Sequence, residues 1–339
     1  MKAMILAAGY GTRLRPVTYT LPKPIMPLCG RPLIAWAIES LLGAGIRDFI
    51  VNLHHLPDPI ERYLRERYAA EGRFEVSYEP EILGTGGGVR KVQKLLERDP
   101  EFLLVNGDTV QFPPYDALRA ARNKLDALAA LTLRHSPRED RFTPVYFDDG
   151  LVTGFGKGTG QAVMFSGTHL ISKRLFDYFP DKAFSGIVDE VYQPLIDSGR
   201  ERIAGVVDDG LWFDIGTPRR YVDASRTLLD LTVRGQLAPA SGTRVAGDSL
   251  IDNTAIVNGA MTRSIAGRRS VVEGTLRKSV VWDDCRIAPG VSLDSCVVAH
   301  GVEIAAPANL RNVLICRDSE AIPRKGEHRF EHGLVLRDI

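Results

Sequence analysis

Long apolar runs, paired cysteines and an excess of charge of either sign are all missing from this sequence. No stretch approaches the roughly 20 apolar residues that a membrane-spanning helix needs. The four cysteines form no CxxC pair, which argues against a zinc site or a disulfide framework and favours buried free thiols. With 43 basic and 42 acidic residues, the net charge of +1 gives no reason to expect nucleic acid or a membrane as a partner. The chain runs into Gly9 without a cleavage-type signal, so we expect a cytoplasmic protein.

The length of 339 residues predicts two domains, because a single core rarely grows so large. Over residues 1–236, short apolar runs alternate with amphipathic stretches, which predicts an α/β domain with a Rossmann-like, mixed, mainly parallel sheet and helices on both faces. The expected strands are Lys2–Leu6, Asp48–Asn52, Phe74–Tyr78, Phe102–Val105, Ala127–Arg134, Gln161–Ile171 and Ile203–Ile215, with a hairpin around Asp148-Asp149-Gly150. The expected helices are Leu33–Leu42, Asp58–Tyr68, Gly88–Glu97 and Tyr115–Lys124, and a last helix capped by Thr217 and ending near Gly235.

The pattern changes over residues 243–339. Helix signals stop, and aliphatic residues recur about every 15 to 17 positions with Gly, Asn and Asp between them, at Leu250-Ile251, Ile265, Val280-Val281, Val297-Val298 and Val313-Leu314. This spacing predicts a β-solenoid whose coils stack a ladder of aliphatic side chains, with a small β-sandwich as the alternative. The segment Ser279–Val291 resembles a left-handed parallel β-helix of hexapeptide type.

A glycine-rich loop follows the first expected strand, in the run Leu6-Ala7-Ala8-Gly9-Tyr10-Gly11-Thr12-Arg13. Small residues allow backbone N–H groups to approach a phosphate chain, so the loop is a candidate anion-binding nest. Arg13 lies inside the loop, and Lys23 follows between two prolines that stiffen its backbone. The spacing is neither a dinucleotide fingerprint nor a P-loop. Nothing comparable favours a phosphate-binding role for Arg15, which we expect to be an ordinary surface or ion-pair residue.

The run from Gly9 to Pro16, followed by Pro22-Lys23-Pro24, resembles the signature of the nucleotide-sugar pyrophosphorylases, that is, the sugar-1-phosphate nucleotidyltransferases. The resemblance implies that the loop binds a nucleoside triphosphate, that Arg13 stabilises departing pyrophosphate and that Lys23 contacts the phosphates near the α-phosphorus. It also places Glu79, Gly84 and Thr85 near the nucleobase. For the glycines after Thr85, a tight turn that leads into a helix is an equally good interpretation.

Two aspartates, Asp108 and Asp214, each end an expected strand, where α/β sheets place ligand-binding residues. They resemble the family's paired metal ligands, and carboxylate oxygens suit Mg²⁺. Asp208 and Asp209 are rival carboxylates, although an Asp-Asp-Gly turn is the simpler interpretation. Asp189 and Glu190 either reach the sugar or face solvent.

The resemblance implies that Gly154 and Gly167 lie at the sugar phosphate, together with Asp108 and Asp214. Many family members carry a Glu-Lys-Pro segment here, which this sequence replaces by Gly154-Phe155-Gly156-Lys157-Gly158. Lys157 therefore either contacts the sugar phosphate or is a solvated loop residue.

The implied reaction joins a nucleoside triphosphate and a sugar-1-phosphate to give an NDP-sugar and pyrophosphate. Glu79 and the β-helix resemble guanylyltransferases, which implies mannose-1-phosphate guanylyltransferase; a heptose-1-phosphate guanylyltransferase, a uridylyltransferase or a thymidylyltransferase are the alternatives. A non-catalytic, nucleotide-sugar-sensing subunit is a rival of another class, and the retained Arg13, Lys23, Asp108 and Asp214 argue against it. A second rival is a bifunctional enzyme with His300 as the base of an acyltransferase. Because β-helices of this kind often present an assembly face, we expect a homo-oligomer.

Overall fold

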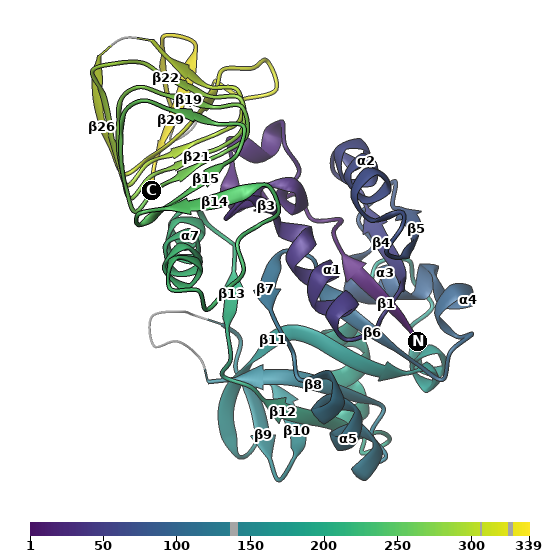
Figure 1. Cartoon of the computed structure of the whole chain (residues 1–339). Helices are drawn as coiled ribbons and strands as arrows, with labels where there is room; N and C mark the ends of the chain where they lie inside the picture. The colour runs from purple at the N-terminus through teal and green to yellow at the C-terminus, as the bar shows by residue number, and fades with distance from the viewer. Residues whose placement is uncertain (136–141, 306, 325–327) are drawn as a thin grey trace. The chain divides into compact units, whose positions relative to one another are not determined.

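The computed structural model describes residues 1–135, 142–305, 307–324 and 328–339 (Figure 1). The chain folds into two compact units that interleave in sequence. The first contains Met1–Tyr10 and Ile34–Phe213, and the second contains Gly11–Leu33 and Asp214–Ile339. The glycine-rich loop is therefore shared between the units. The division into domains at residues 236 and 243 remains a prediction.

The first unit is built on a mixed sheet with the strand order β5-β4-β1-β6-β11-β8-β12-β10-β9. Strands β5, β4, β1 and β6 are parallel, whereas β11 runs antiparallel between β6 and β8. Its core includes the fully buried Met4, Phe102 and Leu104. The strands of this sheet are β1 (Lys2–Leu6), β4 (Asp48–Leu53), β5 (Arg73–Tyr78), β6 (Glu101–Asn106), β8 (Ala129–Arg134), β9 (Val145–Asp148), β10 (Leu151–Phe155), β11 (Gln161–Ser172) and β12 (Ile203–Val207). The predicted α/β class is confirmed.

The helices of the first unit follow the predicted order. They are α1 (Leu33–Gly43), α2 (Pro57–Tyr68), α3 (Gly84–Lys91), α4 (Gln93–Leu96), α5 (Tyr115–Lys124) and α6 (Gln193–Asp197). The prediction of a single helix from Gly88 to Glu97 is wrong. The helix begins at Gly84, because the N–H groups of Gly86 and Gly87 in its first turn find an acceptor in the carbonyl oxygen of Ser185.

The Asp149-Gly150 turn joins β9 to β10 as a hairpin, as predicted. Both turn residues have positive φ, 42° and 83°, which suits the twist of the two strands. The prediction of one strand from Ile203 to Ile215 is wrong, because the chain forms β12 and then β13 (Trp212–Asp214). The break falls where Gly210 N–H donates to Asp208 Oδ1 at 3.1 Å in a side-chain turn.

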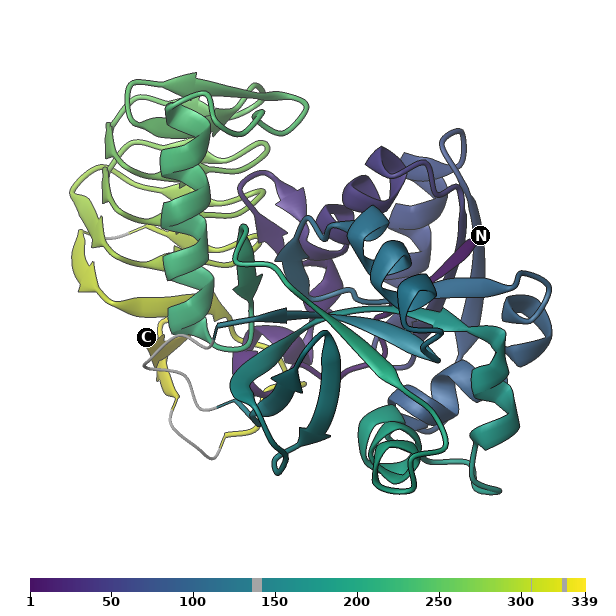
Figure 2. The same ribbon diagram turned by 90° about the horizontal axis from the view of Figure 1, so that it is seen from below.

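Helix α7 (Pro218–Val233) opens the C-terminal part of the second unit. Thr217 caps it, since its hydroxyl oxygen accepts the backbone N–H of Arg220 at 3.3 Å, and Pro218 occupies the first helical position. The helix lies along the stacked coils that follow it (Figure 2). Arg263 of those coils donates to Asp230 of α7 at 2.5 Å, which ties the two elements together.

The C-terminal coils form three sheets with parallel ladders, and antiparallel pairs are added at both ends of the first sheet. This is the arrangement of a left-handed β-helix of hexapeptide type. In the first sheet Leu250, Ile265, Val280, Val297 and Leu314 are successive partners, as the aliphatic spacing predicts. The orders are β14-β15-β18-β21-β24-β27-β29-β28, β16-β19-β22-β25 and β17-β20-β23-β26. The strands are β14 (Thr243–Ala246), β15 (Ser249–Asp252), β16 (Ile256–Val257), β17 (Ala260–Thr262), β18 (Ile265–Ala266), β19 (Val271–Val272), β20 (Thr275–Arg277), β21 (Val280–Val281), β22 (Arg286–Ile287), β23 (Val291–Asp294), β24 (Val297–Val298), β25 (Glu303–Ile304), β26 (Ala308–Arg311), β27 (Val313–Arg317), β28 (Arg329–Glu331) and β29 (Leu334–Asp338).

Buried hydroxyls link one coil to the next. Ser264 N–H donates to Ser249 Oγ, Ser279 N–H to Ser264 Oγ, and Cys296 N–H to Ser279 Oγ, each at 3.1 Å. This ladder satisfies backbone donors at a corner where the sheet hydrogen bonds are interrupted.

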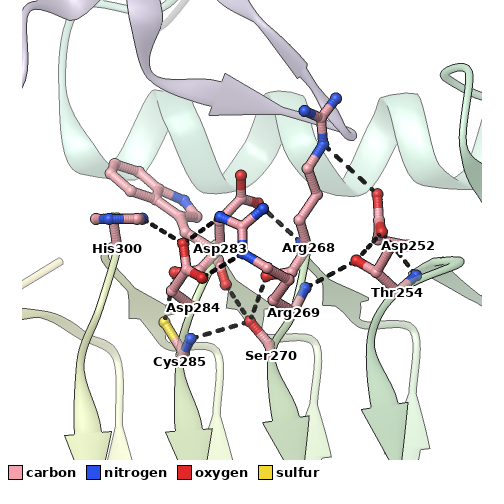
Figure 3. A network of polar contacts seen from close by, with 10 residues as sticks. Asp252, Thr254, Arg268, Arg269, Ser270, Asp283, Asp284, Cys285 and His300 are labelled. Atoms are coloured by element: carbon pink, nitrogen blue, oxygen red, sulfur yellow. Dashed lines mark hydrogen bonds and ion pairs between the residues drawn. The ribbon is translucent and has the colours of Figure 1, made fainter.

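Another corner carries a network of charges (Figure 3). Arg269 donates from Nε and Nη2 to the two carboxylate oxygens of Asp284, both at 2.6 Å, and these hydrogen bonds lower the pKa of Asp284. His300 Nδ1 lies 3.5 Å from the same carboxylate. Burial raises the pKa of the neighbouring Asp283, which accepts Arg268 N–H at 2.9 Å. His300, the candidate acyltransferase base, is thus a solvent-facing member of an ion network, 62% exposed.

Across the described ranges, no helix combines the length and the apolar character that crossing a membrane requires.

Candidate active site

The first half of the glycine-rich loop leaves the carboxyl end of β1, the strand between β4 and β6. Ala7 N–H donates to Asn52 Oδ1 at 2.8 Å, which fixes the start of the loop. Ala8 is buried, whereas Gly9 is exposed, and a Cβ placed on Gly9 would meet no described atom within 4 Å. Packing against the described residues therefore does not require a glycine at position 9. Leu6 ends β1 in register with Asn106 of β6.

Glu79 is buried, 3% exposed, and both of its carboxylate oxygens accept hydrogen bonds. Oε1 accepts Asn52 Nδ2 at 2.8 Å, and Oε2 accepts Leu83 N–H at 3.1 Å. Through Asn52, the same carboxylate is linked to Ala7 at the start of the first loop. Glu79 thus connects the first glycine loop to the second one.

The second glycine loop forms the first turn of α3. Gly84 has φ +73°, and a Cβ there would lie 2.5 Å from the carbonyl oxygen of Ser185. Thr85 Oγ1 accepts Ile187 N–H at 3.0 Å. The carbonyl oxygen of Ser185 also accepts the N–H groups of Gly86 and Gly87. These hydrogen bonds fix the first turn of the helix against Ser185–Ile187. They support the interpretation of Gly86 and Gly87 as a tight turn that leads into a helix.

Asp108 follows β6 at the same edge of the sheet as Gly9. The intervening Gly107 donates its N–H to the carbonyl oxygen of Leu6 at 2.9 Å, which places the residues after β6 beside the start of the loop. Asp108 is half-buried, and Thr109 Oγ1 donates to its Oδ1 at 3.5 Å. The structure therefore brings Asp108, Leu6 and Ala8 together at the carboxyl ends of parallel strands.

Gly167 sits in an irregular stretch of β11, where the pairing with β8 shifts between Phe165 and His169. Its φ of +111° and the nearby Asn106 amide, 3.0 Å from where a Cβ would be, leave room for no side chain. Trp212 Nε1 donates to Ser166 O at 2.8 Å and covers this stretch. The role of Gly167 at the sugar phosphate stays a prediction. The sequence analysis did not single out its neighbour Asn106, for which a polar residue ending a buried strand is the available signal.

Gly154 lies inside β10, paired with Tyr146 of β9, and Lys157 follows the end of the strand. A Cβ on Gly154 would lie 2.1 Å from the carbonyl oxygen of Lys157. Lys157 is 78% exposed, with its Nζ 3.7 Å from Asp197 Oδ2. This favours the solvated interpretation of Lys157.

The rival carboxylates have structural partners. Asp208 closes the turn at Gly210, and Asp209 Oδ2 lies 2.6 Å from His135 Nδ1, a contact that lowers the pKa of Asp209. Asp189 is exposed, and Glu190 lies 2.8 Å from Lys182 Nζ.

The remainder of the loop belongs to the second unit. Gly11 has φ +62°, its carbonyl oxygen accepts Thr18 Oγ1 at 2.9 Å, and a Cβ on it would lie 3.1 Å from Cβ of Lys23. Lys23 is 7% exposed and begins a 3-10 turn between its prolines. Thr12 and Arg13 are exposed in the turn Thr12–Leu14.

Arg13 and Asp214 meet at Gly216, although they lie far apart in sequence. A Cβ on Gly216 would be 2.9 Å from Arg13 Nη2 and 2.9 Å from Asp214 Oδ2. Arg220, one turn into α7, forms an ion pair with the same Oδ2 of Asp214. The guanidinium groups of Arg13 and Arg220 therefore both lie close to the Asp214 carboxylate. Sequence reasoning missed Gly216 and Arg220, although both lie within six residues of Asp214.

The two predicted metal ligands, Asp108 and Asp214, belong to different units. Among the described residues, no group of three or more His, Cys, Asp or Glu side chains could hold an ion. A pair of carboxylates suits Mg²⁺, which is typically bound through one or two carboxylates plus substrate phosphates. Each carboxylate taken by itself has the donor chemistry that Mg²⁺ prefers, and a magnesium site shared by the two stays a prediction.

Two known protein families match this chain. Residues 2–230 match the family described as nucleotidyl transferase. The chain belongs to this family. Residues 242–326 of this nucleotidyl transferase also match the C-terminal hexapeptide region described as GlmU-like.

Relatives of this nucleotidyl transferase carry several substrate names. A mannose-1-phosphate guanylyltransferase of Mycobacterium tuberculosis is 29% identical, over 90% of this chain and 81% of that protein. A mannose-1-phosphate guanylyltransferase 1 of Arabidopsis thaliana is 26% identical, over 93% and 86%. A UTP–glucose-1-phosphate uridylyltransferase of Synechocystis is 28% identical, over 93% and 87%. The crystal structure of HddC from Yersinia pseudotuberculosis, 25% identical, covers 67% of this chain and 98% of its own with a TM-score of 0.57.

Proposed function

We propose that this nucleotidyltransferase joins GTP and mannose-1-phosphate to give GDP-mannose and pyrophosphate. The observation that carries the proposal is the meeting of Arg13 and Asp214 at Gly216, since it sets a guanidinium beside a candidate metal ligand. Relatives named as mannose-1-phosphate guanylyltransferases match 90% and 93% of the chain and so span both units. This supports the choice of substrates.

In the proposed reaction, an oxygen of the sugar phosphate attacks the α-phosphorus of GTP, the bond to the bridging oxygen breaks and pyrophosphate departs in line. The attacking phosphate is already anionic, so positioning and charge neutralisation matter more than a base. The exposed Arg13 would neutralise charge on the pyrophosphate, and Lys23 would hold the α-phosphate. The N–H groups around Gly9 and Gly11 would bind the triphosphate.

Asp108 and Asp214 would hold the magnesium ion, which supplies further neutralisation of phosphate charge when bound. Glu79 and Asn52 would orient both glycine loops, which include Gly84 and Thr85 at the base. Gly154 and Gly167 would border the sugar phosphate. Assembly into a homo-oligomer remains a prediction.

A uridylyltransferase acting on glucose-1-phosphate is the second candidate, because the Synechocystis relative covers as much of the chain as the plant guanylyltransferase does. The two are separated by measuring pyrophosphate release with Mg²⁺ across four nucleoside triphosphates and several sugar-1-phosphates. We expect the highest kcat/KM for GTP with mannose-1-phosphate. A higher kcat/KM for UTP with glucose-1-phosphate would show that the protein is a uridylyltransferase instead. No turnover with any pair of substrates would refute the proposed reaction.

Arg13→Ala tests the mechanism. We expect kcat to fall by roughly 10²–10³-fold, the range for losing a preorganised charge stabiliser. Arg15→Ala is the matched control, because the Arg15 guanidinium stacks on the Tyr19 ring at 4.6 Å and has no assigned role in transfer. Near-wild-type turnover in Arg13→Ala would remove Arg13 from the mechanism.

A further inference from the structure

The last strand of the β-helix reaches the phosphate-binding loop. Arg337 of β29 donates from Nη1 to the carbonyl oxygen of Arg13 at 2.9 Å, and the same nitrogen also donates to the carbonyl oxygen of Arg15. All three residues belong to the second unit. One guanidinium therefore bridges two carbonyls, two residues apart, on the turn that presents the Arg13 side chain.

The position of Arg337 is itself fixed. It pairs with Leu314 in the antiparallel ladder between β27 and β29, and its neighbours Val335 and Leu336 are buried in the β-helix core. The two hydrogen bonds therefore tether the backbone around Arg13 to a strand of the β-helix. The segment that follows the loop is also tied to α7 and the β-helix, because Tyr221 of α7 donates to Pro27 O and accepts Trp282 Nε1 at 2.8 Å.

We propose that Arg337 is a positioning residue for nucleotidyl transfer, which holds the backbone of Arg13 so that its guanidinium stays at Gly216 beside Asp214. The inference rests on the proposed function, in which Arg13 neutralises pyrophosphate. Arg337 touches no reacting atom in this scheme and acts through Arg13 alone. The β-helix thereby takes part in catalysis through a single side chain.

A double-mutant cycle tests the proposal. Arg337→Ala should lower kcat about tenfold, because small displacements of a positioned group are costly, and should leave KM for the sugar phosphate nearly unchanged. In the Arg13→Ala background, the same change should have almost no further effect on kcat, since the two residues act as one unit. Arg337→Lys, which retains donors, should recover part of the loss. An equal loss of kcat in both backgrounds would overturn the proposal.

Amide hydrogen exchange supplies a readout that does not depend on turnover. Exchange in the peptide covering residues 11–16 should be faster in Arg337→Ala than in the wild type. Arg329→Ala is the matched control, because Arg329 lies on the adjacent β28 and its side chain pairs with Asp338 at 3.2 Å. Unchanged exchange in residues 11–16 would overturn the proposal even in an active enzyme. If exchange is faster in Arg337→Ala than in the wild type but the wild type transfers no nucleotide, only the proposed function is refuted, and Arg337 remains the residue that holds this turn.

Discussion

At the scale of single residues, the candidate site depends on a position where a side chain is missing. Gly216 has no positive φ, so an alanine could adopt its backbone conformation. The glycine leaves the space in which the Arg13 guanidinium and the Asp214 carboxylate approach, and Arg220 pairs with the same Oδ2 of Asp214 that faces Gly216. The role of Gly216 is therefore steric.

Gly216→Ala should lower kcat about tenfold or more, because the new methyl group would displace Arg13 or Asp214 from its place. The free energy of unfolding should change little by comparison. Gly43→Ala is the control, since a Cβ there meets no described atom within 4 Å. Steady-state pyrophosphate release and thermal melting would be measured on both variants, and wild-type kcat in Gly216→Ala would show that the close approach is not needed.

The same residues show how far sequence alone reaches. Arg13, Lys23, Asp108 and Asp214 could be nominated because local patterns and a family resemblance mark them. Arg337 could not, because its contact with Arg13 spans 324 positions and depends on the register of β29 against β27. Nothing local distinguishes it from other surface arginines.

At the scale of elements, regular repeats were predictable and local breaks were not. The aliphatic ladder followed from spacing, because each coil must bury the same face. The corners were not predictable, since Arg263, Lys278, Ser295 and Asn312 all take positive φ without a glycine signal. The break between β12 and β13 likewise depends on the Asp208 side chain in competition with strand pairing.

Asp284→Asn should weaken the β-helix at neutral pH by about 0.5–1 kcal/mol, the scale of an ion pair near the surface. The pKa of Asp284 is lowered in the folded state, so its contribution is present above the ordinary carboxyl pKa and is lost as pH falls through the lowered value. The difference between wild type and variant in urea midpoint should therefore shrink below about pH 4. Asp181→Asn, at a fully exposed carboxylate, is the control. If the urea midpoints of wild type and variant differ as much at acid pH as at neutral pH, the ion pair between Asp284 and Arg269 is not the cause of the difference.

At the scale of the whole molecule, the glycine-rich loop is divided between the two units. Residues up to Tyr10 belong to the sheet unit, and residues from Gly11 belong to the unit that carries the β-helix. The second unit also shields its four cysteines, Cys29, Cys285, Cys296 and Cys316, all of which are buried. This confirms the prediction of buried free thiols.

Thiol labelling checks this burial. Burial raises the pKa of Cys29 and of Cys316 to about 12, so almost no thiolate is present at neutral or mildly alkaline pH. We expect iodoacetamide to label no cysteine of the native protein at about pH 8 and all of them in denaturant, as counted by mass spectrometry. Rapid native labelling at any of the four positions would contradict the packing described for it.

The bridge from Arg337 to the loop also has a consequence for synthesis on the ribosome. The loop emerges before Arg337, which follows Arg13 by 324 positions. At translation rates of about 5–20 residues per second, the loop waits roughly 15–65 s before this contact can form. During that interval the nascent chain can build the sheet around β1, but the turn that carries Arg13 lacks its contact with β29. If Arg337 has the role proposed above, a growing chain would transfer nucleotide about tenfold more slowly than a chain in which β29 is already in place.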